Sequence, residues 1–377
     1  MNDQFTIDDL VRVAKRENNA KRSYLYVNPF QGKHIPAPPG KVLSLFGQLQ
    51  ELLEQHWGDE RLLLIGFAET ATAIGGYLAY RAQNAAYFLT TTREETPGAE
   101  VLPFTESHSH AAEQKLILDG LAALVPDVQR VVFVEDEVTT GNTIEKLMEG
   151  LRRHFPALRF GILSILSSMP ETRIADFARK GVPCVCLHRI PQNYQVETLE
   201  VHHYAPPPPP PSEKTSLTVR ELILSRAAWD ARTAAPTAQV RSGCDAFVAE
   251  ALDKISLPQS VERILVLGTE EFMLPPLLLA QALQEACPEA AVRFHATTRS
   301  PILTSPDVDY PFHNRAALDS FYAPGRPTFL YNLAQYDRVY IGTDAPKLNP
   351  GGVSSLLHAL EAYSKPAVTL LRWRASP

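Results

Sequence analysis

Short runs of consecutive hydrophobic residues recur along the first half of the chain, and segments with helical patterns separate them. Runs of this length are typical of strands that a parallel sheet buries on both faces. In such sheets, ligands bind beyond the carboxyl ends of the strands. We predict strands at 61–68, 86–92, 130–135, 159–167 and 182–188.

The second half of the chain repeats this pattern after a run of prolines. Pro206 to Pro211 can join neither a sheet nor a helix, so we predict a stiff polyproline II connector there. Beyond it we predict strands at 263–269, 292–298 and 338–343, and helices at 274–286 and 352–363. The predicted fold class is α/β, with a parallel-sheet domain at 21–190, a proline-rich connector at 191–235 and a second α/β domain at 236–377.

Two pairs of similar segments relate the second α/β domain to the first. AAYFLTTTR, which ends at Arg93, and AVRFHATTR, which ends at Arg299, share Ala, Phe, Thr, Thr and Arg in register. LLLIGFAE, ending at Glu69, and ILVLGTEE, ending at Glu271, each place a glycine and a glutamate after a hydrophobic strand. We interpret these pairs as a duplication followed by divergence. Convergent use of common strand-to-loop residues is the alternative.

Composition narrows the class of protein. The 377 residues are 45% hydrophobic, as in globular proteins, and the formal net charge of -6 argues against an extended nucleic-acid surface. The first residues lack a signal-peptide pattern, and no segment has the roughly 20 apolar residues needed to span a membrane. The four cysteines form no C-x-x-C pair, so we expect reduced thiols. We predict a cytoplasmic protein with no membrane contact.

The segment from Val131 to Thr143 carries the clearest chemical signal. It runs from a hydrophobic strand through two acids into a Thr-Thr-Gly turn that opens a helix. Backbone N–H groups and the positive end of a helix dipole suit a terminal phosphate, and we expect the threonines also to cap a helix at 144–153. An ordinary, well-capped turn is the alternative. The candidate phosphate contacts are Val138, Thr139, Thr140, Gly141, Asn142 and Thr143.

Two adjacent acids, Glu135 and Asp136, stand where the strand ends. Carboxylates accept hydrogen bonds from vicinal hydroxyls, so an acid pair beside a phosphate loop predicts recognition of the ribose 2- and 3-hydroxyls of a 5-phosphorylated sugar. The chain has no G-x-x-x-x-G-K-[ST] and no G-x-G-x-x-G, which argues against a nucleoside triphosphate loop and a dinucleotide fold.

This segment closely resembles the phosphoribosyl pyrophosphate loop of type I phosphoribosyltransferases, which has a hydrophobic strand, two acids, a short spacer and Thr-Gly-x-Thr. The resemblance implies an enzyme that transfers the phosphoribosyl group of 5-phosphoribosyl-1-pyrophosphate (PRPP) to an acceptor, with release of pyrophosphate. Glu135 and Asp136 would act in catalysis. Mg²⁺ would be held mostly by PRPP and water, with Asp136 as its contact in the protein.

The same resemblance implies where the leaving pyrophosphate and the lid lie. The loop after the first core strand, Ala68, Glu69, Thr70 and Ala71, would hold pyrophosphate, and Arg93 would clamp it; a simple turn and a solvated arginine are the alternatives. The long polar insertion at 93–115 corresponds in place to the family's mobile lid. We expect Glu106, His108 and His110 of this insertion to belong to the lid; a metal site is the alternative.

The acceptor is held in this family by a variable hood outside the sheet. The stretch from Tyr24 to Leu43, rich in proline and aromatic residues, is the candidate hood, and a merely structural loop is the alternative. The named acceptor contacts are Asn28, Phe30, Gln31, Lys33 and His34.

The C-terminal half makes the resemblance narrower. Thr298-Arg299-Ser300-Pro301 matches the motif that names the TRSP domain, which occurs fused to phosphoribosyltransferases. Such proteins are associated with bacterial tellurite-resistance and stress-response gene clusters, which implies a nucleoside-like or nucleotide-like product. Residues at the predicted strand ends form a candidate second site, with a scaffold role as the alternative: Glu270, Glu271, Thr298, Arg299, Ser300 and Asp344.

Other classes of function stay open at this point. Some proteins of this fold bind PRPP as regulators without turning it over, and a duplicated domain could instead be a docking surface in an assembly. The predicted partners are PRPP and a small-molecule acceptor, with a homo-oligomer as a further option.

Overall fold

In a computed structural model, the chain divides into two compact units that do not follow the order of the sequence. The structure describes residues 5–17, 22–83, 86–104, 113–206, 215–257 and 262–374. The first unit comprises Phe46–Gln192 and Trp229–Cys244, and the second comprises Met1–Leu45, Asn193–Ala228 and Asp245–Pro377. The boundaries at 21–190, 191–235 and 236–377 stay a prediction.

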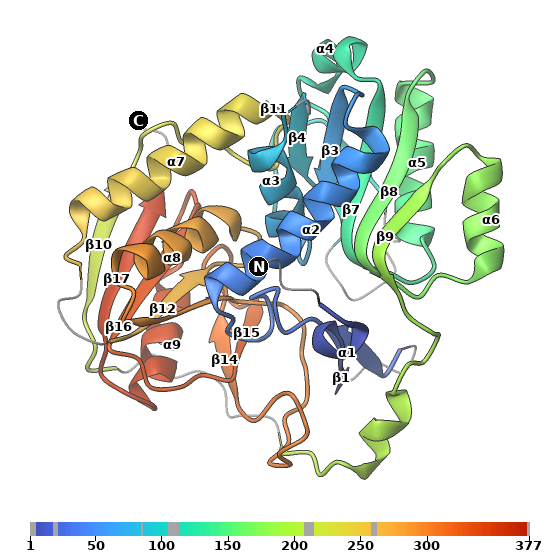
Figure 1. Cartoon of the computed structure of the whole chain (residues 1–377). Helices are drawn as coiled ribbons and strands as arrows, with labels where there is room; N and C mark the ends of the chain where they lie inside the picture. The colour runs from blue at the N-terminus through green and yellow to red at the C-terminus, as the bar shows by residue number, and fades with distance from the viewer. Residues whose placement is uncertain are drawn as a thin grey trace. The chain divides into compact units, whose positions relative to one another are not determined.

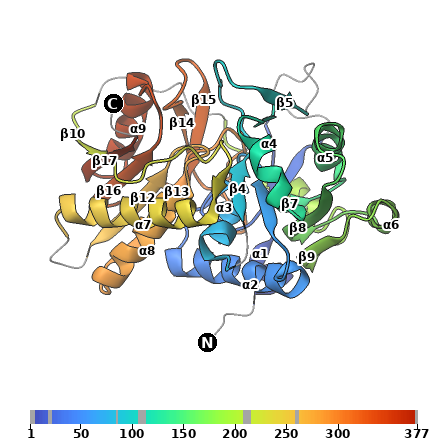
Figure 2. The same ribbon diagram turned by 90° about the horizontal axis from the view of Figure 1, so that it is seen from above.

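The first unit is built on a sheet with the strand order β11-β4-β3-β7-β8-β9. All neighbours from β4 to β9 pair in parallel, and β11 pairs antiparallel with β4 at the edge. The helices α3 and α5 lie on opposite faces (Figure 1 and Figure 2). The strands are β3 (Leu62–Gly66), β4 (Tyr87–Thr90), β7 (Arg130–Val138), β8 (Arg159–Ser167), β9 (Cys184–Arg189) and β11 (Ala235–Pro236). The helices are α3 (Thr72–Arg81), α4 (Leu121–Leu124), α5 (Asn142–His154) and α6 (Glu171–Arg179).

The second unit is built on a sheet with the order β10-β17-β16-β12-β13, in which all neighbours are parallel. The helices α8 and α9 cover opposite faces (Figure 2). The strands are β10 (Val219–Leu224), β12 (Arg263–Gly268), β13 (Ala291–Ala296), β16 (Arg338–Thr343) and β17 (Ala367–Trp373). The helices are α8 (Leu274–Ala286) and α9 (Pro350–Glu361). Two helices continue from one unit into the other, α2 (Pro39–Trp57) and α7 (Thr237–Lys254).

Buried hydrophobic side chains hold each sheet. The hydrophobic residues of β3 and β7 are 0 to 3% exposed, as expected for strands covered on both faces. The predicted α/β fold class, with a parallel-sheet domain followed by further sheets and helices, is confirmed. The strands β10 and β17 were not among those predicted, because polar residues interrupt both: β10 contains Arg220 and Glu221, and β17 contains Arg372. None of the helices in the described part of the chain combines the length and hydrophobicity that a membrane span requires.

Smaller elements accompany the two sheets. In each half, an antiparallel strand pair lies between the second and third of the matching core strands, β5 with β6 and β14 with β15. The predicted irregular insertion at 93–115 therefore contains regular structure on both sides of its centre. The bounds are β5 (Val101–Pro103), β6 (Lys115–Ile117), β14 (Arg315–Asp319), β15 (Pro327–Tyr331), α1 (Ile7–Leu10), β1 (Arg12–Lys15) and β2 (Tyr24–Val27), with 3₁₀ turns at Val125–Asp127 and Val196–Val201.

Candidate active site

The two acids lie at the carboxyl end of β7, the strand between β3 and β8. Glu135 and Asp136 are half-buried, while the five residues before them are buried. Neither carboxylate forms an ion pair with any residue that the structure describes. Burial, and next the negative charge of Asp136, raise the pKa of Glu135 well above its ordinary value. An acid pair without internal cations is available to an external ligand.

Thr70 joins the loop after β3 to this acid pair. Its Oγ1 donates a hydrogen bond of 2.9 Å to Oδ1 of Asp136. The contact follows from the parallel pairing of β3 with β7, in which Gly66 lies opposite Val134, so both strands end at the same edge. The sequence-predicted pyrophosphate loop and the predicted ribose acids are therefore neighbours.

The Thr-Thr-Gly turn is shaped by Gly141. This residue is the N-cap of α5 and has a left-handed backbone with φ of 71°. The predicted threonine cap is wrong: the helix begins at Asn142, and no side chain caps it. Gly141, rather than a threonine, occupies the N-cap position, and it has no side chain that could cap the helix.

Backbone N–H groups of this turn are open. Within the described residues, the amides of Thr139, Thr140, Gly141 and Thr143 donate to no protein acceptor, while the amide of Asn142 lies 3.4 Å from Thr140 Oγ1. Thr139 and Thr143 are half-buried and Thr140 is exposed. A helix start with free N–H groups and nearby hydroxyls is an anion-binding arrangement. Val138 is buried at the end of β7, so only its backbone could contribute.

Helix α6 supports the turn through Arg173, a residue that the sequence patterns did not single out. Its guanidinium donates to the carbonyl of Thr140 at 3.2 Å, and to Asn142 Oδ1 at 3.3 Å. It also pairs with Glu145 at 2.8 Å. Arg173 thus holds both ends of the turn from outside. Thr140 lies 33 positions before Arg173 in the chain, so only the tertiary fold brings the two together.

The loop from Ala68 to Ala71 is held by its backbone. The amide of Ala68 donates to Thr91 Oγ1 at 2.8 Å, and Gln114 Nε2 donates to the carbonyl of Ala68 at 3.1 Å. The peptide bond between Ala68 and Glu69 is cis. Ala68, Glu69 and Ala71 are buried, and Thr70 is half-buried. These contacts fix the main chain of the predicted pyrophosphate loop beside Asp136.

The structure describes Arg93 but not the three predicted lid residues. Arg93 is half-buried just beyond β4, after Thr92, whose Oγ1 accepts from the amide of Glu94 at 2.9 Å. It therefore lies at the same sheet edge as the acid pair. The named lid residues Glu106, His108 and His110 lie outside the described residues.

The candidate hood belongs to the second unit. Lys33 is fully buried, and its Nζ donates to the carbonyl oxygens of Glu270 at 2.7 Å and Thr297 at 2.9 Å. His295, also buried, lies 3.2 Å from the carbonyl of Gly32 through its Nδ1. Asn28, Gln31 and His34 are buried as well, and Phe30 is half-buried against Phe5. These buried contacts favour a structural role for Lys33 over the predicted contact with the acceptor.

Two family models match the chain in the order that the sequence predicts. A model described as phosphoribosyl transferase matches residues 10–187, and one described as the TRSP domain C-terminal to it matches residues 235–360. The chain is a phosphoribosyltransferase domain fused to a TRSP domain. None of the curated proteins compared with the chain matches it.

About half of the chain is similar to solved phosphoribosyltransferase structures. The chain is 14% identical to adenine phosphoribosyltransferase from Rhodothermus marinus, covering 49% of this chain and 96% of that one, with a TM-score of 0.35. It is 19% identical to orotate phosphoribosyltransferase from Aeropyrum pernix, covering 47% and 88%, with a TM-score of 0.31. These scores add nothing to the family assignment, which rests on the two family models.

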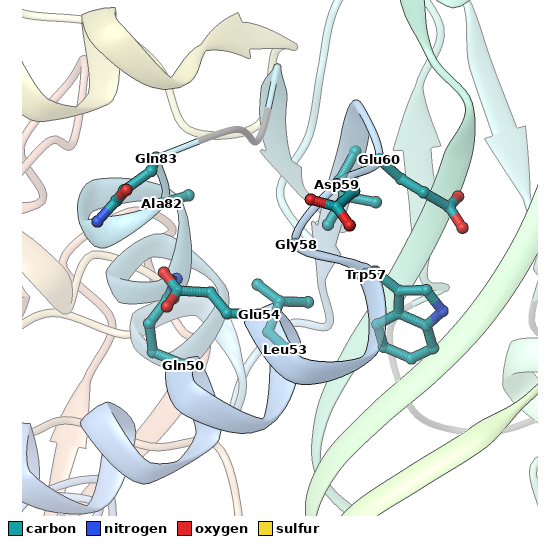
Figure 3. Close-up of a pocket in the computed structure, with 10 residues that line it drawn as sticks. Gln50, Leu53, Glu54, Trp57, Gly58, Asp59, Glu60, Ala82 and Gln83 are labelled. Carbon is teal, nitrogen blue, oxygen red and sulfur yellow. Dashed lines mark hydrogen bonds between the residues drawn. The ribbon is translucent and has the colours of Figure 1, made fainter.

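The phosphoribosyltransferase domain has a surface pocket at the amino end of β3, whereas the acid pair lies at the carboxyl end of β7. Figure 3 shows the residues that line this pocket. It has a volume of about 240 Å³ and lies where α2 and α3 end and β3 begins. In Figure 3, Glu54, Asp59 and Glu60 carry the charged groups around it. The residues that line it are Gln50, Leu53, Glu54, Trp57, Gly58, Asp59, Glu60, Leu62, Ala82 and Gln83. None of the predicted site residues lines this pocket.

The acid pair of the phosphoribosyltransferase domain fits magnesium only as a partial ligand set. No group of three or more His, Cys, Asp or Glu in the described residues could hold a metal ion by itself. Asp136 offers one half-buried carboxylate, next to the Thr70 hydroxyl. This set fits an ion that keeps most of its oxygen ligands from substrate and water, as Mg²⁺ does.

The candidate second site lies in the other unit, at the carboxyl ends of β12, β13 and β16. Arg299 Nε lies 2.6 Å from Glu270 Oε2, and Arg299 Nη2 lies 4.0 Å from Glu271 Oε1. Tyr322 donates a hydrogen bond to Asp344. The fold thus brings the strand-end residues together: Glu270, Glu271 and Thr298 are buried, and Arg299, Ser300 and Asp344 are half-buried.

Proposed function

We propose that the chain transfers the 5-phosphoribosyl group of PRPP to a nitrogen acceptor and releases pyrophosphate. The observation that carries this proposal is the edge of the first sheet. One strand-to-helix junction there carries both the carboxylates of Glu135 and Asp136 and the amides of the Thr-Thr-Gly turn. These amides donate to no acceptor among the residues that the structure describes. A phosphate and a ribose diol need these two chemistries side by side.

The 5-phosphate would bind at the start of α5. The amides of Thr139, Thr140, Gly141 and Thr143 supply donors, and the helix dipole favours the negative charge. Gly141 gives the turn its left-handed backbone, which a residue with a side chain adopts only at a cost. Arg173 keeps the turn in this shape through the Thr140 carbonyl.

The ribose would bind to the acid pair. Glu135 and Asp136 accept hydrogen bonds from its 2- and 3-hydroxyls, and Thr70 orients Asp136 through their 2.9 Å hydrogen bond. When the bond from C1 to pyrophosphate breaks, positive charge develops on the sugar. Carboxylates held near the ring stabilise that charge electrostatically, and the acceptor attacks C1 from the opposite face.

The leaving pyrophosphate would lie along Ala68–Ala71, with Arg93 as its cationic partner. Guanidinium suits this role because it offers paired donors to phosphate oxygens. When Mg²⁺ is bound with PRPP, it neutralises charge on the leaving group. Lid residues Glu106, His108 and His110 would exclude water from the reacting sugar.

The acceptor is a base or a base-like nitrogen compound, and the product is a nucleoside-like or nucleotide-like metabolite. The TRSP fusion supports a role in tellurite resistance or the stress response. We place the reaction in the cytoplasm, with PRPP and a small molecule as the partners and a homo-oligomer as the candidate assembly.

The test is pyrophosphate release from Mg-PRPP with a panel of candidate bases. Asp136→Asn should lower turnover on the order of 100-fold or more, because it removes a charge that the transition state needs. Glu149→Gln changes an exposed acid of α5 and should leave turnover unchanged. Wild-type turnover by Asp136→Asn would remove the proposed role of the acid pair. PRPP binding without product from any acceptor would instead favour a regulatory protein, and no binding would favour an assembly role.

A further inference from the structure

The two halves of the chain share one order of elements. In the first half, the order is α2, β3, α3, β4, the β5–β6 pair, β7, α5 and β8, with the short helix α4 and a 3₁₀ turn added before β7. In the second half, α7, β12, α8, β13, the β14–β15 pair, β16, α9 and β17 follow in the same order. The sheets also agree, since β4-β3-β7-β8-β9 corresponds to β13-β12-β16-β17-β10. The last strand differs in its place along the chain, because β10 precedes its helix α7 while β9 follows β8.

Matching hydrogen bonds show that the correspondence extends to single residues. The amide of Thr91 donates to the carbonyl of Gly66 at 3.0 Å, and that of Thr297 donates to Gly268 at 3.0 Å. The hydroxyl of each threonine then accepts from the loop after the first strand. In the first half the donor is Ala68 N at 2.8 Å, and in the second it is Glu270 N at 2.9 Å.

The next threonine of each half is also equivalent. Thr92 pairs with Lys115 of β6, and Thr298 pairs with Phe329 of β15, both as antiparallel bridges. Bonds repeated at equivalent positions favour duplication over convergent use of common loop residues. Placed in this register, Ala68 corresponds to Glu270, Arg93 to Arg299 and Asp136 to Asp344.

At the position of the first half's small Ala68, the second half has a buried carboxylate. Glu270 is 0% exposed, and its Oε2 lies 2.6 Å from Arg299 Nε and 3.0 Å from Arg326 Nη2. Its Oε1 accepts from Ser320 Oγ at 2.5 Å. Two guanidinium groups converging on one carboxylate are what a bound pyrophosphate would require. In the second half, the protein supplies that anion itself.

The start of α9, which corresponds to the phosphate-binding start of α5, is also filled. Asn349 is its N-cap and accepts from the amide of Gly351 at 3.1 Å. Asp319 Oδ2 accepts from Asn349 Nδ2 at 2.9 Å, and lies 2.6 Å from where a Cβ on Gly351 would be. A carboxylate beside a helix N-terminus takes the place that a phosphate takes in an open one. In the equivalent turn of the first half, the amides of Thr139, Thr140, Gly141 and Thr143 have no acceptor among the described residues.

We propose that the second half is a duplicated phosphoribosyltransferase fold in which Glu270 and Asp319 occupy the pyrophosphate and phosphate positions, so that it takes no PRPP. The inference rests on the proposed function, because the first half defines the two anion positions. Asp344 keeps the place of Asp136, but Tyr322 donates to it. Lys33 also holds the loop after β12 in place, because its Nζ donates to the carbonyls of Glu270 and Thr297.

The first test is the stoichiometry of binding, measured by calorimetry with the full-length chain and Mg-PRPP. We expect one site per chain, and Asp344→Asn should leave both this site and its affinity unchanged. Two sites per wild-type chain would overturn the inference while leaving the proposed function in place.

The second test vacates the internal anion and uses pyrophosphate as the probe. Glu270→Ala recreates the residue of the first half, and should add a pyrophosphate site, with affinity gained on the order of tenfold or more over wild type at that position. Adding Arg299→Ala should remove this site again. Glu270→Ser also vacates this position and serves if the alanine variant does not fold. Folded variants that gain no pyrophosphate affinity would overturn the inference. A new site in Glu270→Ala, in a protein whose wild type binds no PRPP, would sink only the proposed function.

Discussion

At the scale of one residue, the buried position that suits the Glu135 carboxylate for binding lowers the folding stability of the protein when this carboxylate is charged. The carboxylate lies at the end of a buried strand, beside Asp136, with no cation from the described residues to balance it. Burial and the neighbouring charge raise its pKa. In an unfolded chain the same group titrates near 4.5. The folded protein therefore binds this proton more tightly than the unfolded chain does.

The raised pKa fixes the sign of a pH effect on stability. As the pH rises from about 4.5 through the raised value, the unfolded chain loses this proton first, so the folded state loses stability. Glu135→Gln should remove that loss. We expect the variant to be more stable than wild type at neutral pH, with the difference shrinking toward pH 4.5. Urea unfolding across this range measures it. Glu149→Gln is the exposed control, and a constant difference at every pH would contradict the assignment.

At the scale of the element, the turn between β7 and α5 depends on the backbone of Gly141 and on the helix packed beneath it. Gly141 has φ of 71°, and a Cβ placed there would lie 2.7 Å from Phe177 Cε2 in α6. The same helix supplies Arg173, which holds the Thr140 carbonyl. The turn therefore packs against helix α6 and depends on it for its shape, although the two are separate in the sequence.

Gly141→Ala tests this packing. The alanine would suffer the cost of a left-handed backbone, about 1–2 kcal/mol, and would also displace Phe177. Gly181→Ala is a matched control, because Gly181 has φ of 71° and nothing within 4 Å of its would-be Cβ. We expect Gly141→Ala to lower both the free energy of unfolding and the affinity for PRPP, and Gly181→Ala to lower only the former. Calorimetry and thermal unfolding separate the two effects, and equal PRPP affinities in both variants would refute this account of the turn.

At the scale of the whole molecule, the compact units exchange segments of the chain. Residues 1–45 belong with the second sheet, where Ala37 exchanges backbone hydrogen bonds of 2.9 and 2.8 Å with Phe294. Residues 229–244 belong with the first, where Ala235 and Pro236 pair with β4. Each half of the sequence therefore lacks part of the unit that it mainly builds.

A cut in the connector tests this exchange. The fragment 236–377 lacks Lys33 and Ala37, so Glu270 and Phe294 lose buried partners. We expect it to be markedly less cooperative in thermal unfolding than the full chain, and to regain stability when co-expressed with residues 1–235, which supply the N-terminal segment and β10. Deleting residues 1–37 from the full chain should cause the same loss. If 236–377 unfolds as cooperatively as the intact protein, the predicted domain boundary is correct and the exchanged segment is dispensable.

The sequence alone determined the α/β class, the strands that build most of both sheets, and the Val131 to Thr143 motif. These features depend on local periodicity and on residues close together in the chain, which is why a single sequence carries them. The repeated strand ends at Arg93 and Arg299 were visible for the same reason. Backbone N–H groups at this turn were also expected from the sequence, but the N-cap was not, because the left-handed Gly141 stands where a threonine cap was predicted.

Only the tertiary structure decided which distant residues meet. Thr70 reaches Asp136 because β3 and β7 are neighbours in the sheet, and Arg173 reaches the turn because α6 packs under it. Lys33 and Glu270 lie 237 positions apart and share a hydrogen bond through the fold. Strand order and packing between elements are non-local, so the composition of no single segment contains them.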